Sequence, residues 1–153
     1  MKKIFFIGAL SLLSLSSCNN EEDPIITLTP EQMLVGTWSI SKFVMTSGAD
    51  NSEMSSVEAD DCTKTSTYEF MGDKNLHFEI YSDGGSNCTL LSEVGGYYHY
   101  DVPNKILSCY KDDNTEDYLQ IISLNAKEMV ILQEVKDYDG DGMKDRTFAY
   151  FVK

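Results

Sequence analysis

The chain has 153 residues and a formal net charge of −13, with 25 acidic against 12 basic side chains. Its length fits one domain of ordinary size. The acidic excess argues against nucleic acid as a partner, because phosphates would be repelled, and against docking on anionic lipid through a basic patch. It favours solubility, cations or basic partners, and solubility alone is a sufficient reason for it.

The N-terminal segment predicts export and a lipid anchor. Two lysines precede an apolar run over residues 4–15, and two serines then lead to Cys18. This is the three-region pattern of a secretory signal peptide, and the run is shorter than the roughly 20 residues that span a bilayer. Its end resembles the lipobox of bacterial lipoproteins, which implies cleavage before Cys18 and diacylation of its sulfur. We therefore expect a signal peptide over residues 1–17 and lipidation at Cys18.

Residues 18–28 are polar and acidic and are then interrupted by Pro24, which predicts a tether between the lipid and the domain. The acidic run after the cysteine resembles the signal that sends some lipoproteins of Gram-negative bacteria to the outer leaflet of the outer membrane. That resemblance implies an outer membrane lipoprotein exposed at the cell surface. The alternative is a plain solvated linker.

A short helix is predicted to begin directly after Thr29. Thr29 can act as the N-cap, Pro30 fits the first helical position, and Glu31 favours the positive end of the helix dipole. Gly36 is expected to end the helix.

The rest of the chain alternates between strand-like runs and turns. The runs are rich in β-branched and aromatic residues, and Gly, Pro, Asn and Asp separate them. Short links favour antiparallel pairing of neighbours, and closure removes the two exposed edges of an open meander. We expect residues 29–153 to form an all-β, up-and-down antiparallel barrel of about eight strands with the short helix at its start; a two-sheet sandwich is the alternative. Residues 47–61 are expected to form a surface loop, with a lid role as the alternative.

Three cysteines remain after Cys18. An oxidising envelope permits one disulfide among them, and we favour Cys62–Cys88, because both residues lie in polar, turn-like stretches at strand ends. Cys109 is interpreted as a buried strand residue, and it lacks the electropositive setting of a reactive thiol.

Several short motifs resemble the lipocalin-like domain lipoproteins of Gram-negative bacteria. Residues 34–38 look like the opening of such domains, a short helix followed by Gly-x-Trp in the first strand. Residues 96–98 with 104–107 look like the second half of the pattern, with Tyr98 where many relatives carry Trp. In that group a strand resembling residues 66–70 follows the first cysteine. The resemblance covers roughly residues 33–153 and implies, by analogy of fold, a small apolar molecule held inside a barrel.

The predicted interior is rich in aromatic rings. Trp38 is interpreted as a structural plug next to the helix, because its large ring buries much apolar area. Four tyrosines are candidate contacts for a small apolar or aromatic ligand: Tyr68, Tyr98, Tyr100 and Tyr110. A small barrel either fills its interior with side chains or holds one small ligand, and the filled interior is the commoner outcome.

The sharpest local motif is an acidic loop over residues 137–145. Its carboxylates alternate as in the first nine places of a calcium loop, a glycine stands at the sixth place, and a backbone carbonyl fills the seventh. The expected calcium ligands are Asp137, Asp139, Asp141, Met143 and Asp145. The twelfth place carries no glutamate and the flanks look like strands, so weak binding is expected; a hairpin loop with acidic turn residues is the alternative.

Nothing in the sequence favours catalysis. The two histidines, His77 and His99, lie in strand-like segments, and no nucleophile elbow or phosphate-binding glycine loop is present. We therefore expect a lipid-anchored envelope protein, not an enzyme, that binds a small molecule or a partner. The alternative is a structural module with a filled barrel, accessory to an outer-membrane assembly.

Overall fold

The structure is a computed structural model, and it describes residues 27–84 and 87–153. The predicted signal peptide over residues 1–17 and the predicted lipidation site Cys18 lie outside the described residues, as does the predicted tether apart from residues 27–28.

Helix α1 (Pro30–Leu34) begins where the sequence predicts it. The Thr29 hydroxyl accepts a hydrogen bond from the Gln32 backbone N–H at 3.3 Å, and the Gln32 side chain accepts one from the Thr29 N–H at 2.9 Å. This reciprocal capping box satisfies two amide donors that a helix start would leave unpaired. Gly36 then opens the first strand with a φ of +132°, a backbone conformation that favours glycine.

The described residues contain nine strands and a second short helix, α2 (Asp61–Thr65). The strands are β1 (Gly36–Thr46), β2 (Glu53–Glu58), β3 (Thr67–Phe70), β4 (Asn75–Asp83), β5 (Cys88–Asp101), β6 (Ile106–Lys111), β7 (Glu116–Leu124), β8 (Glu128–Lys136) and β9 (Asp145–Val152).

The sheet closes into a barrel because β1 pairs with β9 along one edge. On its other edge β1 pairs with β3 through Gly36, Thr37 and Trp38, and further along with β2 from Lys42 to Thr46. β3 therefore lies beside the first part of β1, and β2 lies beside its last part, on the same edge of that strand. Every pairing is antiparallel, so the predicted up-and-down barrel with a short N-terminal helix is confirmed.

The loop predicted over residues 47–61 is wrong in part, because this segment contains β2 and the first residue of α2. All residues of β2 are exposed, so the strand shows no alternation of buried and exposed side chains, and among the described residues it pairs with β1 alone. α2 is capped by Asp60, whose side chain accepts hydrogen bonds from the N–H groups of Cys62 and Thr63, each at 2.9 Å.

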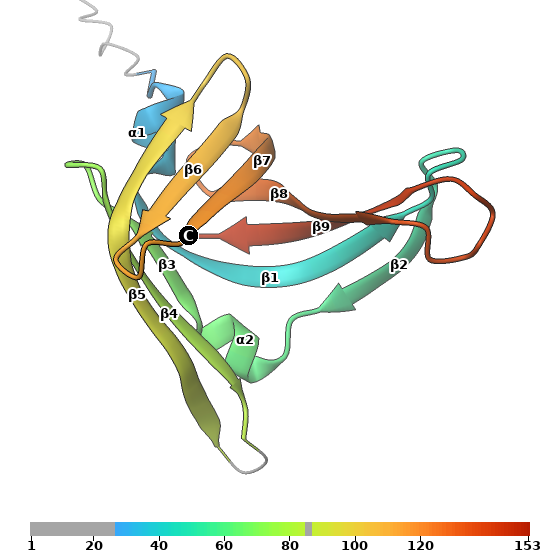
Figure 1. The fold of residues 1–153 in the computed structure, drawn as a ribbon, viewed down its shortest axis with the longest axis horizontal. Coiled ribbons are helices and arrows are strands. Elements are labelled where there is room, and N and C mark those ends of the chain that lie inside the picture. The colour runs from blue at the N-terminus through green and yellow to red at the C-terminus, as the bar shows by residue number, and fades with distance from the viewer. Residues whose placement is uncertain (1–26, 85–86) are drawn as a thin grey trace, which may run out of the picture.

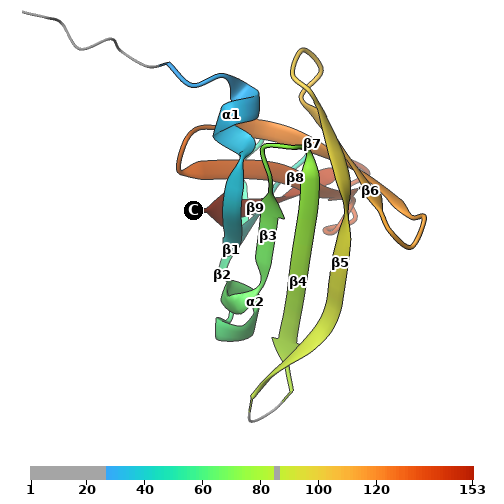
Figure 2. The ribbon, with the colours of Figure 1, turned by 90° about the vertical axis from the view of Figure 1, so that its left-hand side faces the viewer.

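The two ends of the barrel differ. At the end near α1, the fully buried Trp38 indole donates a 2.7 Å hydrogen bond to the carbonyl of Leu34. The structural role predicted for Trp38 fits this position. Away from α1, the β4–β5 hairpin diverges from β1, β2 and β9 (Figures 1 and 2).

The predicted disulfide is present. Cys62 in α2 is bonded to Cys88 at the start of β5, which ties the short helix to the diverging β4–β5 hairpin. Cys109 is a free, buried thiol in β6, as expected.

Candidate ligand-binding cavity

A cavity of about 320 Å³ lies inside the barrel. Every strand except β2 contributes to its wall, because alternate side chains of each strand point inward. The lining residues are Ile40, Tyr68, Phe70, Phe78, Ile80, Ser92, Val94, Lys111, Asp117, Leu119, Met129, Ile131, Gln133, Ala149 and Phe151. The interior is therefore not filled by side chains alone.

One wall of the cavity is a cluster of aromatic rings. Tyr68 meets Phe151 edge-on, with ring centroids 5.3 Å apart, and Phe78 at 5.2 Å. Phe70 packs edge-on against Phe78 at 5.5 Å. Such edge-to-face contacts hold the rings in fixed positions. Burial raises the pKa of Tyr68, so its hydroxyl stays neutral inside this apolar wall.

A polar pair lies in the cavity lining where β6 ends and β7 begins. The Lys111 ammonium is 2.9 Å from a carboxylate oxygen of Asp117. The hydrogen bond that the Lys111 ammonium donates to Asp117 raises the pKa of Lys111, which keeps the ammonium charged. Ser92 and Gln133 are the other polar residues of the lining, and Gln133 and Asp117 are exposed. The polar part of the lining therefore faces the open side of the barrel.

Lys111 and Asp117 were not among the site residues predicted from the sequence. The alternation of β6 could have indicated that Lys111 points inward, because Leu107 and Cys109 are buried and Lys111 lies on the same face of the strand. A lysine at the end of a strand was not an obvious inward residue, since the long side chain usually reaches solvent.

The four tyrosines predicted to contact ligand do not share the cavity. Tyr68 lines it. Tyr98 is buried and its hydroxyl donates to the carbonyl of Met71 at 2.8 Å, while Tyr100 lines a separate hollow of about 180 Å³ near α1.

Tyr110 lies on the other face of β6 and stacks on the exposed Tyr97, with ring centroids 4.7 Å apart. Neighbouring residues of a strand point to opposite faces, and the next residue, Lys111, lines the cavity. Tyr110 therefore does not share the cavity with Tyr68, contrary to the prediction from the sequence. Tyr68 alone of the four is a residue of the cavity lining.

The predicted calcium loop follows β8 and ends in β9. Carboxylate oxygens of Asp137, Asp139 and Asp145 lie within 4.8 Å of one another. Asp141 instead accepts a hydrogen bond from the Met143 N–H at 2.6 Å. The structure thus brings three of the predicted side-chain ligands together.

Asp145 is the fully buried member of this loop. One of its oxygens accepts from the Tyr138 N–H at 2.8 Å and the other from the Gly48 N–H at 2.9 Å. These backbone donors, Tyr138 first, lower the pKa of Asp145. The carboxylate therefore joins the loop before β9 to the turn between β1 and β2.

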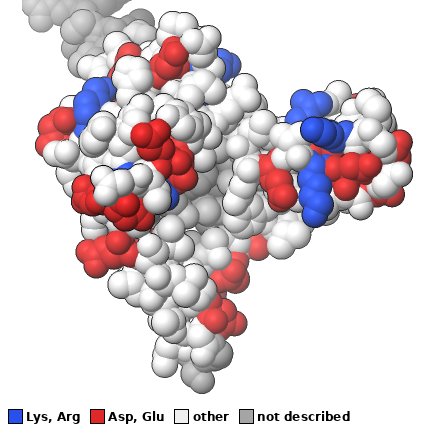
Figure 3. All heavy atoms as spheres, in the orientation of Figure 1, with Lys and Arg blue, Asp and Glu red and all other residues white. Residues whose placement is uncertain are grey.

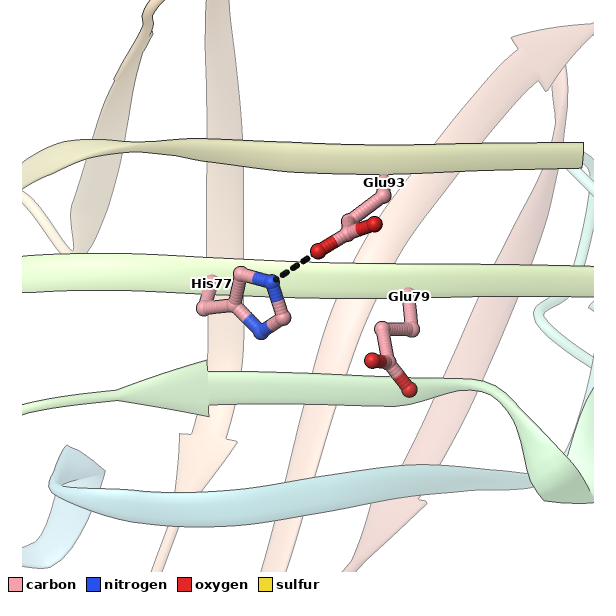
Figure 4. A group of neighbouring side chains, drawn as sticks. All are labelled: His77, Glu79 and Glu93. Carbon is pink, nitrogen blue, oxygen red and sulfur yellow. Dashed lines mark hydrogen bonds and ion pairs between the residues drawn. The ribbon is translucent and has the colours of Figure 1, made fainter. Parts of the chain in front are cut away.

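A further group with metal-ligand chemistry lies on the outer face of β4 and β5 (Figure 4). His77 Nε2 is 3.2 Å from a carboxylate oxygen of Glu93, and Glu79 pairs directly across the sheet from Glu93. The neighbouring Leu76 and Phe78 are buried, so His77 points away from the barrel interior. This group is separate from the cavity.

The fold and the cavity define a class of protein, a small antiparallel barrel that encloses an apolar space next to a short N-terminal helix. The chain belongs to the lipocalin-like domain family, whose sequence model matches residues 34–131.

Solved structures with similar folds include a lipocalin-like protein from Bacteroides uniformis, with 14% sequence identity and a TM-score of 0.49, covering 79% of this chain and 98% of that one. A bovine lipocalin allergen has 15% identity and a TM-score of 0.42, covering 80% and 74% of the two chains. Bovine odorant-binding protein in complex with undecanal has 16% identity and a TM-score of 0.41, covering 86% and 77%. A comparison with curated proteins finds no match. The family assignment rests on the family model.

Proposed function

We propose that this protein binds a small, mainly apolar molecule inside its barrel, without catalysis. The observation that carries the proposal is the cavity of about 320 Å³ with a wall of aromatic and aliphatic side chains. Its volume lies at the lower end of the ~300–1,000 Å³ range of ligand pockets.

The cavity also bears on the alternative function. A structural module that assists an outer-membrane assembly needs no interior space, and a filled barrel would serve it better. The open volume therefore favours ligand binding over the structural role.

Ligand binding is tested with the neutral fluorophore N-phenyl-1-naphthylamine and the full chain. We expect saturable binding and a rise in melting temperature, because a ligand at 100 times its Kd stabilises the folded state by about 2.7 kcal/mol. The control is Ala149→Leu, which places extra methyl groups where a buried residue lines the cavity. Equal binding by this variant would locate the fluorophore elsewhere and contradict the proposal.

We also propose that the domain is anchored at the outer membrane through a lipid on Cys18. The signal-like segment and the lipobox resemblance support this. Among the described residues, no helix has the length and apolar character needed to cross a membrane. Metabolic labelling with palmitate tests the proposal: we expect label on the wild type and none on Cys18→Ser.

We propose calcium as a weakly bound ion of the loop at residues 137–145. The specific support is the convergence of Asp137, Asp139 and Asp145 within 4.8 Å, since calcium takes about six to eight oxygen ligands. Millimolar calcium is expected to raise the melting temperature of the wild type, and chelator to lower it. Asp139→Asn should remove this response, whereas Asp112→Asn in the β6–β7 turn should keep it. An unchanged wild-type melting curve would contradict the site.

A further inference from the structure

The cavity lining is chemically uneven. Aromatic and aliphatic side chains make up most of it, while its polar groups besides the Tyr68 hydroxyl belong to Ser92, Lys111, Asp117 and Gln133. Lys111 is the last residue of β6, whereas Lys105, in the turn before that strand, lines the second hollow together with Pro30 of α1. The polar groups thus lie toward the end of the barrel away from α1.

We propose that the ligand is an uncharged amphiphile whose hydrogen-bonding head group lies at the Lys111–Asp117 pair and whose apolar tail fills the aromatic part of the cavity. This inference rests on the proposed function and specifies its ligand class. It specifies the chemistry of the head group, which the volume of the cavity does not determine.

An anionic head group is disfavoured, although the cavity contains a lysine. The Lys111 ammonium already contacts Asp117 at 2.9 Å, so a carboxylate ligand would have to displace that partner or lie beside it. Asp113, in the adjoining turn, also acts on the Lys111 charge. Acidic side chains outnumber basic ones in the chain, and several lie on the face shown in Figure 3.

A cationic head group is disfavoured by the same pair. It would approach Asp117 with the Lys111 ammonium only 2.9 Å from that carboxylate, and like charges repel strongly where water is partly excluded. The side chain of Lys111 is 20% exposed and that of Asp117 48%, so the pair is partly shielded from solvent. An ion of either sign therefore meets a like charge at this position.

A neutral head group that both donates and accepts suits the pair. The Lys111 ammonium has three N–H donors and the Asp117 carboxylate has several acceptor positions, so the ion pair between them leaves bonding capacity on each. An alcohol or a primary amide can accept from Lys111 and donate to Asp117 without separating them. Hydrogen bonds to charged groups are the stronger ones, so the pair gives such a head group a defined position.

The test compares three unbranched ligands with nine carbon atoms each: nonanol, nonanoate and nonylammonium. Each displaces N-phenyl-1-naphthylamine from the purified full chain at neutral pH, where both ionic ligands are charged. We expect nonanol to bind at least about tenfold tighter than either ion. Nonanoate or nonylammonium binding as tightly as nonanol would overturn the inference while leaving the proposed function intact. Failure of the fluorophore itself to bind would overturn the proposed function.

Two variants give the neutral Lys111–Asp117 pair a net charge, one positive and one negative. Asp117→Asn leaves Lys111 uncompensated and should raise nonanoate affinity relative to nonanol about tenfold; Lys111→Met leaves Asp117 uncompensated and should favour nonylammonium similarly. Lys42→Met, on β1 outside the cavity lining, is the matched control and should leave the order of the ligands unchanged. Melting curves confirm that each variant is folded, and the wild-type comparison stands without them. Selectivity unaltered by both variants would overturn the placement of the head group.

Discussion

The ammonium of Lys153 lies 4.5 Å from the centre of the Trp38 ring. It also donates to the carbonyls of Met33 and Val35, each at 2.7 Å. A residue beyond the last strand therefore holds the final turn of α1 against the start of β1. These carbonyls belong to the end of the helix, where intrahelical partners run out.

Replacing Lys153 should loosen α1 from the barrel. Lys153→Met keeps the apolar stem and removes two charge-assisted hydrogen bonds and the cation–π contact, so we expect a loss of about 1–3 kcal/mol in the free energy of unfolding. Urea denaturation measures it. Lys144→Met, an exposed lysine in the acidic loop, is the control and should change stability by less than about 0.5 kcal/mol. Equal effects of the two variants would contradict a clamp at Lys153.

The disulfide should contribute strongly to stability. It closes a loop with a sequence separation of 26 residues, for which the chain-entropy model gives about 3–4 kcal/mol. We expect dithiothreitol to lower the melting temperature of the wild type. The double variant Cys62→Ser/Cys88→Ser should melt at the lower temperature with or without reductant, whereas a response of this variant to reductant would assign the effect to another group.

Asp145 should make stability depend on acid pH. Its pKa is lowered in the folded protein, chiefly by the Tyr138 N–H and then by the Gly48 N–H. A carboxyl with a lowered folded pKa stabilises the protein above its unfolded pKa of about 3.9 and loses this contribution as pH falls toward the folded value. Thermal melts between neutral pH and acid should therefore show a steep loss below about pH 4–5 in the wild type.

Asp145→Asn should reduce the loss of stability at acid pH, because the amide does not titrate. It should also lower stability at neutral pH, because an amide nitrogen would face one of the two backbone N–H donors. Asp112→Asn, an exposed aspartate in the β6–β7 turn, serves as the control and should keep the wild-type profile. If Asp145→Asn lost stability at acid pH as steeply as the wild type, other carboxyl groups would be the cause of that loss.

The Cys109 thiol should be inert in the native protein. Burial, with Asp117 next, raises its pKa to about 12, so almost no thiolate forms at pH 8. We expect iodoacetamide to leave Cys109 unmodified for hours in native buffer and to alkylate it in urea, as followed by mass spectrometry. Rapid alkylation of the native protein would mean that β6 opens locally.

The architecture could be predicted because it depends on local patterns. Strand-length runs separated by turn residues specify a meander, and Thr29 with Pro30 marks the start of α1. The pairing of Cys62 with Cys88 followed from two polar stretches next to strand ends. By contrast, β2 was missed because an edge strand exposed on both faces carries no hydrophobic alternation.

The candidate site depended on tertiary structure. Which tyrosines face inward is set by strand register, and irregularities such as the one between Ile40 and Lys42 shift the alternation along a strand. Tyr68 and Tyr110 are both aromatic strand residues in the sequence, yet one lines the cavity and the other stacks outside it. The meeting of Lys111 with Asp117 and the volume left between the walls arise only when the barrel closes, because they depend on how distant strands are placed.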